Sequence, residues 1–213
     1  MSAYAQFDDR RLFELIRSGN HDAFTQLVTR YTDQFFALAY RTLGSVEDAR
    51  DVVQQAFVNL WVRPHMWRPD KAKFTTWFYR VILNACHDQL RRGAKTATVE
   101  PAEFDRAVGE TFMESHSATK DVADTVAERQ HTEWQRHSLR RWIAELPSAQ
   151  RDALTLVVQS ELPQREAAEV LGVSVKALES LLIRAKRNLA QQLAVEQSKQ
   201  RRDSPLLRNI LSQ

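Results

Sequence analysis

The sequence has little glycine, a single cysteine and no long apolar run. Five glycines among 213 residues are about a third of average usage, and an all-β sandwich or barrel needs many more turns than this supports. The one cysteine, Cys86, cannot form an internal disulfide, which excludes a secreted scaffold held by bridges. No stretch of about 18 uncharged apolar residues exists, and the N-terminal segment lacks the apolar core of a signal peptide. These absences predict a soluble, cytoplasmic protein of the all-α class.

The sequence also lacks the motifs of common catalytic and metal sites. It contains no phosphate-cradling glycine loop, no dinucleotide fingerprint and no HExxH motif. Cys86 and His87 are neighbours without a second pair at metal-ligand spacing, and no nucleophile stands in a pattern with a base. We therefore expect no enzyme activity, no cofactor and no metal. Cys86 is expected to pack as a small apolar residue on its helix.

Charge is distributed unevenly, although the net charge is only +3. Residues 68–92 contain six basic and two acidic side chains, residues 93–133 contain four basic and nine acidic ones, and residues 174–193 contain four basic and one acidic. Two basic segments on either side of an acidic one favour a polyanion contacted at two places, and nucleic acid is the usual candidate. Solvated charge on ordinary helices is the alternative.

Apolar residues recur at helical spacing through most of the chain. A first long helix is predicted to begin after Asn20, which would be its N-cap, and to stop at Gly44. A second helix is predicted to begin at Ser45, which stands three residues before Asp48 in a pattern similar to a capping box. Its inward face would consist of Ala49, Val52, Val53, Ala56, Phe57, Leu60 and Trp61.

A loop and a third helix follow. The two prolines between residues 63 and 70 remove backbone donors and fix φ, so a loop is expected that exposes Trp67. The third helix is predicted from Phe74 to about Arg92. One of its faces would carry Trp77, Arg80, Asn84, Asp88 and Arg91. Aromatic rings beside guanidinium and amide groups can stack on bases and bind phosphates; the alternative is that Trp77 packs under the preceding loop.

The domain organisation follows from where periodicity is lost. Residues 93–120 have no helical pattern and predict a flexible acidic linker, and helical spacing returns near Asp121. We therefore expect two small helical domains, at 1–92 and 121–193, joined by that linker and followed by a polar tail at 194–213.

The strongest local motif predicts a helix-turn-helix between Gln164 and Leu178. Ala168 supplies the small residue needed where the two helices cross, and Gly172 tolerates a positive φ at the turn. Leu178 would anchor the second helix in the core, and Ser174 would cap it. The side chains presented to a DNA major groove would be Lys176, Glu179, Ser180, Ile183, Arg184 and Arg187.

Three segments, in this order, give most of residues 10–193 a resemblance to the extracytoplasmic-function (ECF) sigma factors, a group of the sigma-70 family of bacterial RNA polymerase. Residues 48–61, DARDVVQQAFVNLW, are similar to the family's polymerase-binding helix. Residues 74–84, FTTWFYRVILN, with Asp88 and the LRR run at 90–92, are similar to its minus-ten segment. The minus-thirty-five domain is matched by Leu146, Pro147, Gln150, Arg151, Ala153, Leu154, Glu166, Ala168, Arg184 and Ala185.

The resemblance implies a region 2 helical bundle and a region 4 helix-turn-helix domain. Such a protein binds core RNA polymerase, through the clamp coiled coil and the flap, and directs promoter-specific transcription initiation. Region 2 would recognise and melt the minus-ten element, and region 4 would bind the minus-thirty-five element. The resemblance also implies an anti-sigma factor that holds the protein inactive until a stress signal, and no small-molecule substrate.

The resemblance further implies roles for individual residues. The polymerase-binding residues would be Asp48, Asp51, Gln54, Gln55, Phe57 and Trp61. The minus-ten contacts would be Trp67, Lys73, Trp77, Arg80, Asn84, Arg91 and Arg92. The minus-thirty-five contacts would be Ser174, Lys176, Glu179, Ser180, Ile183, Arg184 and Arg187. Trp67 or Trp77 would stack on a flipped base, and the arginines of the third helix would hold phosphates without reading sequence.

The chain departs from the family in the recognition helix. The run at 177–181, ALESL, stands where family recognition helices often carry two more basic side chains. Direct recognition of the minus-thirty-five bases by these residues is therefore weakened. Two alternatives from the residues stay open. A helix-turn-helix repressor would use residues 1–92 to bind a ligand or dimerise, and alone would bind palindromic duplex tightly. A sigma mimic would sequester an anti-sigma protein, and should lack the two basic segments.

Overall fold

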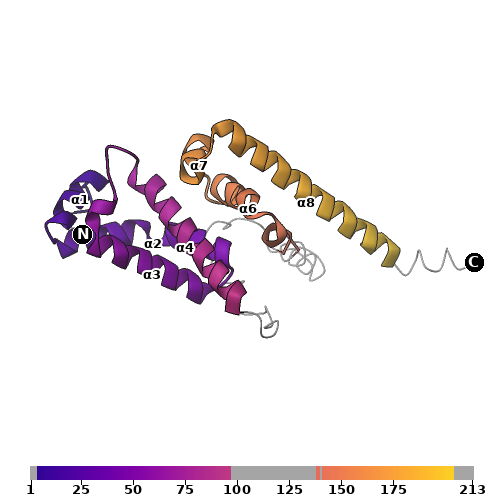
Figure 1. The fold of residues 1–213 in the computed structure, drawn as a ribbon, viewed down its shortest axis with the longest axis horizontal. Coiled ribbons are helices and arrows are strands. Elements are labelled where there is room, and N and C mark those ends of the chain that lie inside the picture. The colour runs from indigo at the N-terminus through magenta and orange to yellow at the C-terminus, as the bar shows by residue number, and fades with distance from the viewer. Residues whose placement is uncertain (1–3, 97–137, 140, 204–213) are drawn as a thin grey trace, which may run out of the picture.

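The described residues form only helices and the short segments between them. The structure, a computed structural model, describes residues 4–96, 138–139 and 141–203, and no strand occurs among them (Figure 1). This confirms the all-α prediction for that part of the chain. Within the same residues, no helix combines the length and apolar character that a bilayer span requires.

Four helices form the N-terminal bundle (Figure 1). They are α1 (Asp9–Arg17), α2 (His21–Leu43), α3 (Val46–Val62) and α4 (Phe74–Thr96), and the short 3-10 turn η1 (Pro64–Met66) lies between the last two. Helices α2, α3 and α4 pack against one another, and α1 packs on α2. The predicted loop is therefore present, with one short turn inside it.

The predicted boundaries of the first two long helices are confirmed. The Asn20 side chain accepts a hydrogen bond of 2.9 Å from the Ala23 N–H, and Gly44 ends α2 with φ of +75°. Such a left-handed C-cap suits glycine because it has no Cβ to clash. The Ser45 hydroxyl accepts from the Asp48 N–H at 3.2 Å and starts α3.

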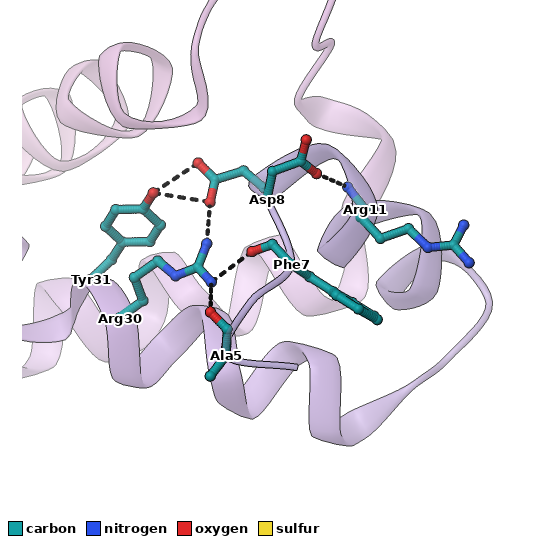
Figure 2. A network of polar contacts seen from close by, with 7 residues as sticks. Ala5, Phe7, Asp8, Arg11, Arg30 and Tyr31 are labelled. Carbon is teal, nitrogen blue, oxygen red and sulfur yellow. Dashed lines mark hydrogen bonds and ion pairs between the residues drawn. The ribbon is translucent and has the colours of Figure 1, made fainter. Parts of the chain in front are cut away.

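Two side chains of α2 anchor the start of the chain and of α1 (Figure 2). Arg30 donates to the Asp9 carboxylate at 2.9 Å and to the Phe7 carbonyl at 2.7 Å, and the Tyr31 hydroxyl donates to the same carboxylate at 2.8 Å. Burial, reinforced by the neighbouring Asp9, raises the pKa of Tyr31 above its usual value. Asp8 caps α1 by accepting from the Arg11 N–H at 2.8 Å. The network fixes α1 against the bundle.

Aromatic rings fill the centre of the bundle. Phe35 of α2 lies 4.7 Å from Phe78 and 6.4 Å from Phe57 between ring centroids, and Phe74 lies 5.1 Å from Phe13. All of these rings are buried. Edge-on and tilted pairs at such distances stabilise beyond the area that they bury, by about 0.5–1.5 kcal/mol per pair. Cys86, in the same buried cluster, is fully buried, as predicted, and burial raises the pKa of its thiol to about 12.

The C-terminal helices contain the predicted helix-turn-helix. Helical turns at 138–139 and 141–145 precede α6 (Ser148–Leu154), the single π-helical turn η3 (Thr155–Gln159), α7 (Gln164–Leu171) and α8 (Val175–Asp203). Gly172 has φ of +69° at the turn between α7 and α8.

The interior of the helix-turn-helix also matches the prediction. The Ser174 hydroxyl accepts from the Ala177 N–H at 3.2 Å and caps α8. Ala168 and Leu178 are buried where the two helices cross. A small residue at the crossing allows the backbones to approach, and the leucine fills the space beneath the turn.

The first residues of the predicted linker and of the predicted tail are helical. Helix α4 continues to Thr96 and α8 continues to Asp203, so helix extends past the expected boundaries at 92 and 193. The rest of the predicted linker, and residues 121–137 of the helix predicted to begin near Asp121, lie outside the described residues. The domain boundaries therefore stay predictions.

The two groups of helices share one hydrophobic core. Ala167, Val170 and Leu178 of the helix-turn-helix belong to the same buried cluster as Phe78 and Leu83 of the N-terminal bundle. Helix α4 packs against α7, and α2 packs against η3. A second, smaller cluster joins α6 to α8 through Leu146, Leu154 and Ala185.

Candidate protein and nucleic-acid interfaces

One exposed face of α3 combines polar and apolar side chains. Asp51, Gln54, Gln55, Val58 and Val62 follow one another at helical spacing, and all five are exposed, Val62 at 66%. Sequence reasoning found the first three and missed the two valines. Their signal was present: apolar residues on the outward side of an amphipathic helix mark a surface that can bind another protein.

The other predicted polymerase-binding residues are less accessible. Phe57 is 5% exposed and lies 4.9 Å from Phe78 between ring centroids, so the expectation of a surface contact is wrong for it. Trp61 is half-buried, with its ring 4.5 Å from that of His21. The Asp48 carboxylate accepts a hydrogen bond of 3.0 Å from Gln89 of α4. These three side chains hold α3 in the bundle.

The expectation that the loop exposes Trp67 is wrong. Trp67 is 2% exposed, its ring lies 4.3 Å from that of Phe13, and its indole N–H donates to the Ala72 carbonyl at 3.0 Å. Arg17 of α1 also donates to the Trp67 carbonyl at 3.1 Å. The loop folds back on α1 because the ring gains apolar contacts and its N–H finds a partner.

Trp77 is the more accessible tryptophan. It is half-buried, and its ring lies 5.7 Å from that of Phe78 and 6.1 Å from that of Phe74. One side of the indole therefore packs on the core while part of it meets solvent. A ring held in this way is positioned for stacking at low entropic cost.

The polar residues of the predicted minus-ten face lie on α4 or just before it. Lys73, Arg80, Asn84, Arg91 and Arg92 are all exposed. Arg91 pairs with Asp88 one turn earlier on the same helix. Lys73 and Arg80 instead contact α7. The ammonium of Lys73 lies 2.5 Å from the Glu166 carboxylate. Arg80 donates to the backbone carbonyl of Val170 at 2.9 Å and also to the backbone carbonyl of Glu169.

A cleft of about 300 Å³ lies between α4 and the helices α6 to α8. Asn84 and His87 line it on one side, and Asp152 and Val170 on the other. The His87 ring Nε2 lies 3.1 Å from an oxygen of Asp152, which is only 4% exposed. The hydrogen bond to Asp152 raises the pKa of His87, against the opposing effect of burial. A buried carboxylate of α6 thus has its partner on α4.

The outward side of the helix-turn-helix is open to solvent. Exposed side chains there comprise Ser174, Lys176, Glu179, Ser180, Ile183, Arg184 and Arg187. Ile183 is 67% exposed, and the Ser180 hydroxyl donates to the Lys176 carbonyl at 3.0 Å. Because Lys176, Arg184 and Arg187 lie within one stripe of α8, their charges can act on one strand of phosphates. The Ser174 hydroxyl accepts the capping hydrogen bond from the Ala177 N–H.

The described part of the chain shows no cluster of potential metal ligands. No three His, Cys, Asp or Glu side chains gather there closely enough to hold an ion. The arrangement instead offers two basic surfaces and one mixed polar and apolar surface, which are features of a protein that binds macromolecules.

Comparison with known proteins gives a consistent result for both halves. A family model described as Sigma-70 region 2 matches residues 27–96, and one described as Sigma-70, region 4 matches residues 136–189. The ECF RNA polymerase sigma-E factor of Escherichia coli is 31% identical over 181 residues, which are 85% of this chain and 92% of the relative.

Two solved structures are also similar. CnrH, solved in complex with the cytosolic domain of CnrY, has 30% sequence identity and a TM-score of 0.60 over 88% of this chain and 97% of that one. The sigma factor RpoE of Bartonella quintana, solved with the anti-sigma factor NepR, has a TM-score of 0.55 over 81% of this chain and 97% of that one. Because the identity to this second structure is 17%, the similarity shows a common fold alone.

Proposed function

The chain belongs to the extracytoplasmic-function sigma factors of the sigma-70 family, and we propose that it directs core RNA polymerase to a specific set of promoters. Its region 2 recognises and melts the minus-ten element, and its region 4 binds the minus-thirty-five element. It acts in the cytoplasm, where the polymerase is, as a transcription factor and not as a catalyst. The observation that carries the proposal is the match of both regions, in order, to a bundle and a helix-turn-helix.

The exposed α3 face is the proposed polymerase-docking surface. Asp51, Gln54 and Gln55 supply polar contacts, and Val58 and Val62 supply apolar area next to them. A protein interface needs such a mixture, because apolar burial gives affinity and the polar groups fix orientation. The partner is the clamp coiled coil of the largest polymerase subunit.

The α4 surface is proposed to hold the opened minus-ten strand. Extruding a base costs a few kcal/mol of unstacking and unpairing, and stacking on Trp77 would return about 1–3 kcal/mol. Trp67 is left out of this set because its ring lies in the core. The polar contacts come from Lys73, Arg80, Asn84, Arg91 and Arg92, and charge on this surface adds affinity without reading sequence.

The stripe on α8 is proposed to hold the minus-thirty-five duplex. Lys176, Arg184 and Arg187 would contact phosphates, while Glu179 and Ser180 stand where they can meet base edges. Ile183 adds apolar contact of the kind that thymine methyl groups accept. Only three basic side chains contact phosphates in this proposal, so region 4 alone should bind weakly and depend on the polymerase for affinity.

An anti-sigma factor is the proposed regulator. RpoE of Bartonella quintana, which has the same fold, is solved with such a factor. Release of the anti-sigma factor would couple transcription to a stress signal.

The test is association with core polymerase that lacks a specificity subunit. The purified chain should co-elute with core enzyme, and should bind a promoter duplex weakly unless that enzyme is present. Tight binding to palindromic duplex by the chain alone would instead support a repressor. Failure to join the polymerase would refute the proposal.

A further inference from the structure

Helix α7 occupies the side of α4 that the proposed function assigns to minus-ten DNA. We propose that α7 is an intramolecular latch: in the free protein it holds Lys73 and Arg80, and it must release them before the minus-ten strand can bind. The inference rests on the proposed function, because it concerns the regulation of the same surface. It makes region 4 an inhibitor of region 2 without any anti-sigma factor.

The C-terminal end of α7 holds Arg80. The Arg80 Nε–H donates to the Val170 carbonyl at 2.9 Å, and a second guanidinium nitrogen donates to the Glu169 carbonyl. Carbonyls in the last turn of a helix carry partial negative charge and have acceptor capacity left over; the Glu169 carbonyl accepts from the Gly172 N–H at 3.3 Å as well as from Arg80. They therefore occupy the Arg80 N–H groups that a phosphate would otherwise accept from, with a weaker, uncharged acceptor. While these N–H groups are engaged with α7, they cannot donate to DNA.

The turn of the helix-turn-helix abuts the same guanidinium. A Cβ added at Gly172 would meet Arg80 Nη2 at 3.6 Å, so the turn lies in ordinary contact with it. Arg80 itself stays at the rim, where much of its side chain meets solvent. A rim position suits a releasable contact, because water can replace the carbonyls when α7 leaves.

The N-terminal end of α7 holds Lys73. The Lys73 ammonium lies 2.5 Å from the Glu166 carboxylate in the first turn of α7. Between the two polar contacts, Ala167 and Val170 are buried in the cluster that also contains Leu83. The apolar contact between two polar ends fixes α7 in one register against α4. The exposed Lys73–Glu166 ion pair itself adds only modest stability to this arrangement. The latch is therefore specific and can be opened.

Contacts beyond α7 close the same interface. His87 of α4 pairs with the buried Asp152 of α6 at 3.1 Å, and Arg41 of α2 donates to the Ser160 hydroxyl at 3.2 Å. The minus-thirty-five stripe on α8 stays exposed throughout. The closed form thus hides minus-ten contacts while it leaves minus-thirty-five contacts free, which would prevent the free protein from capturing opened promoter DNA.

A zero-length carbodiimide crosslink tests the latch in the full chain. Lys73 and Glu166 are close enough to form an amide, so the free protein should yield a Lys73–Glu166 crosslinked peptide by mass spectrometry. Adding core polymerase together with a promoter should reduce that yield several-fold. A free protein without the crosslink, or a yield that polymerase and promoter leave unchanged, would overturn the proposal.

A charge reversal tests the consequence for DNA. Glu166→Lys should raise the affinity of the free protein for a single-stranded minus-ten oligonucleotide about fivefold, because it replaces an attraction by a repulsion and enlarges the binding-competent fraction. Glu145→Lys is the matched control: it makes the same charge change on an exposed side chain beside α8, and should change the affinity less than twofold.

Equal gains for the two variants would mean that added charge, not opening, is responsible, and would refute the latch. Circular dichroism should show that both variants keep the helical content of the unmodified protein. Loss of the latch and loss of the proposed function are distinguishable. If the chain joins polymerase and starts transcripts while the crosslink is absent, only the latch is wrong. If it never joins polymerase, the proposed function is wrong.

Discussion

Removing the two arginines of the α8 stripe should flatten the salt dependence of promoter binding. Arg184 and Arg187 are exposed on the side of α8 proposed to meet phosphates. Each phosphate contact adds about −0.9 to the slope of log K against log salt on duplex DNA. The double variant Arg184→Ala/Arg187→Ala should therefore lose about 1.8 of that slope.

The size of the effect at working salt follows from this slope. Between 50 and 200 mM salt, the unmodified holoenzyme should lose roughly tenfold more affinity than the variant holoenzyme. Equilibrium binding of holoenzyme to a promoter duplex across that salt range measures the slope. Lys186→Ala is the control, because Lys186 is also exposed but points about 100° around the helix from Arg187. An unaltered slope in the double variant would show that this stripe does not face phosphate.

Three further predictions concern docking, pH and the core. Asp51→Lys should weaken association with core polymerase severalfold in a titration, whereas Asp33→Lys, which reverses another exposed charge, on α2, should not. Equal losses for the two variants would remove the α3 face from the interface. The hydrogen bond to Asp152 raises the pKa of His87, while burial, Arg151 and Arg91 oppose the shift. The contribution of His87 to the free energy of unfolding is therefore present below the ordinary histidine pKa and is lost as pH rises through the raised pKa. The difference in melting temperature between the unmodified protein and His87→Gln should accordingly shrink from pH 5.5 to pH 8, and a constant difference would contradict this. Leu178→Ala should cost about 2–5 kcal/mol in chemical denaturation, as expected for a fully buried leucine; a loss below about 1 kcal/mol would mean that the helix-turn-helix core is looser than the structure shows.

Local signals in the sequence predicted the three long helices of the bundle and the turn of the helix-turn-helix, but not α1 or α6. Asn20, Gly44 and Ser45 act at the positions where the spacing placed helix ends, since capping depends on residues only a few positions apart. Gly172 and Leu178 located the helix-turn-helix for the same reason. The outward stripe of α8 followed from helical spacing alone.

Contacts between distant segments could not be predicted. Trp67 is buried because Phe13 and Arg17, about fifty positions earlier, come to lie over the loop. Phe57 was assigned to a surface through family resemblance, although its own spacing placed it inward. The pairing of α4 with α7 depends on the relative placement of two domains, for which a single sequence carries no periodic signal.

The most direct test of the central claim is promoter-specific initiation in a purified system. Core RNA polymerase without a specificity subunit is incubated with a library of bacterial promoter fragments, with and without this protein, and transcript 5′ ends are mapped. We predict defined start sites that appear only with the protein and share minus-ten and minus-thirty-five elements. The same transcripts with and without it, or none at all, would contradict the account.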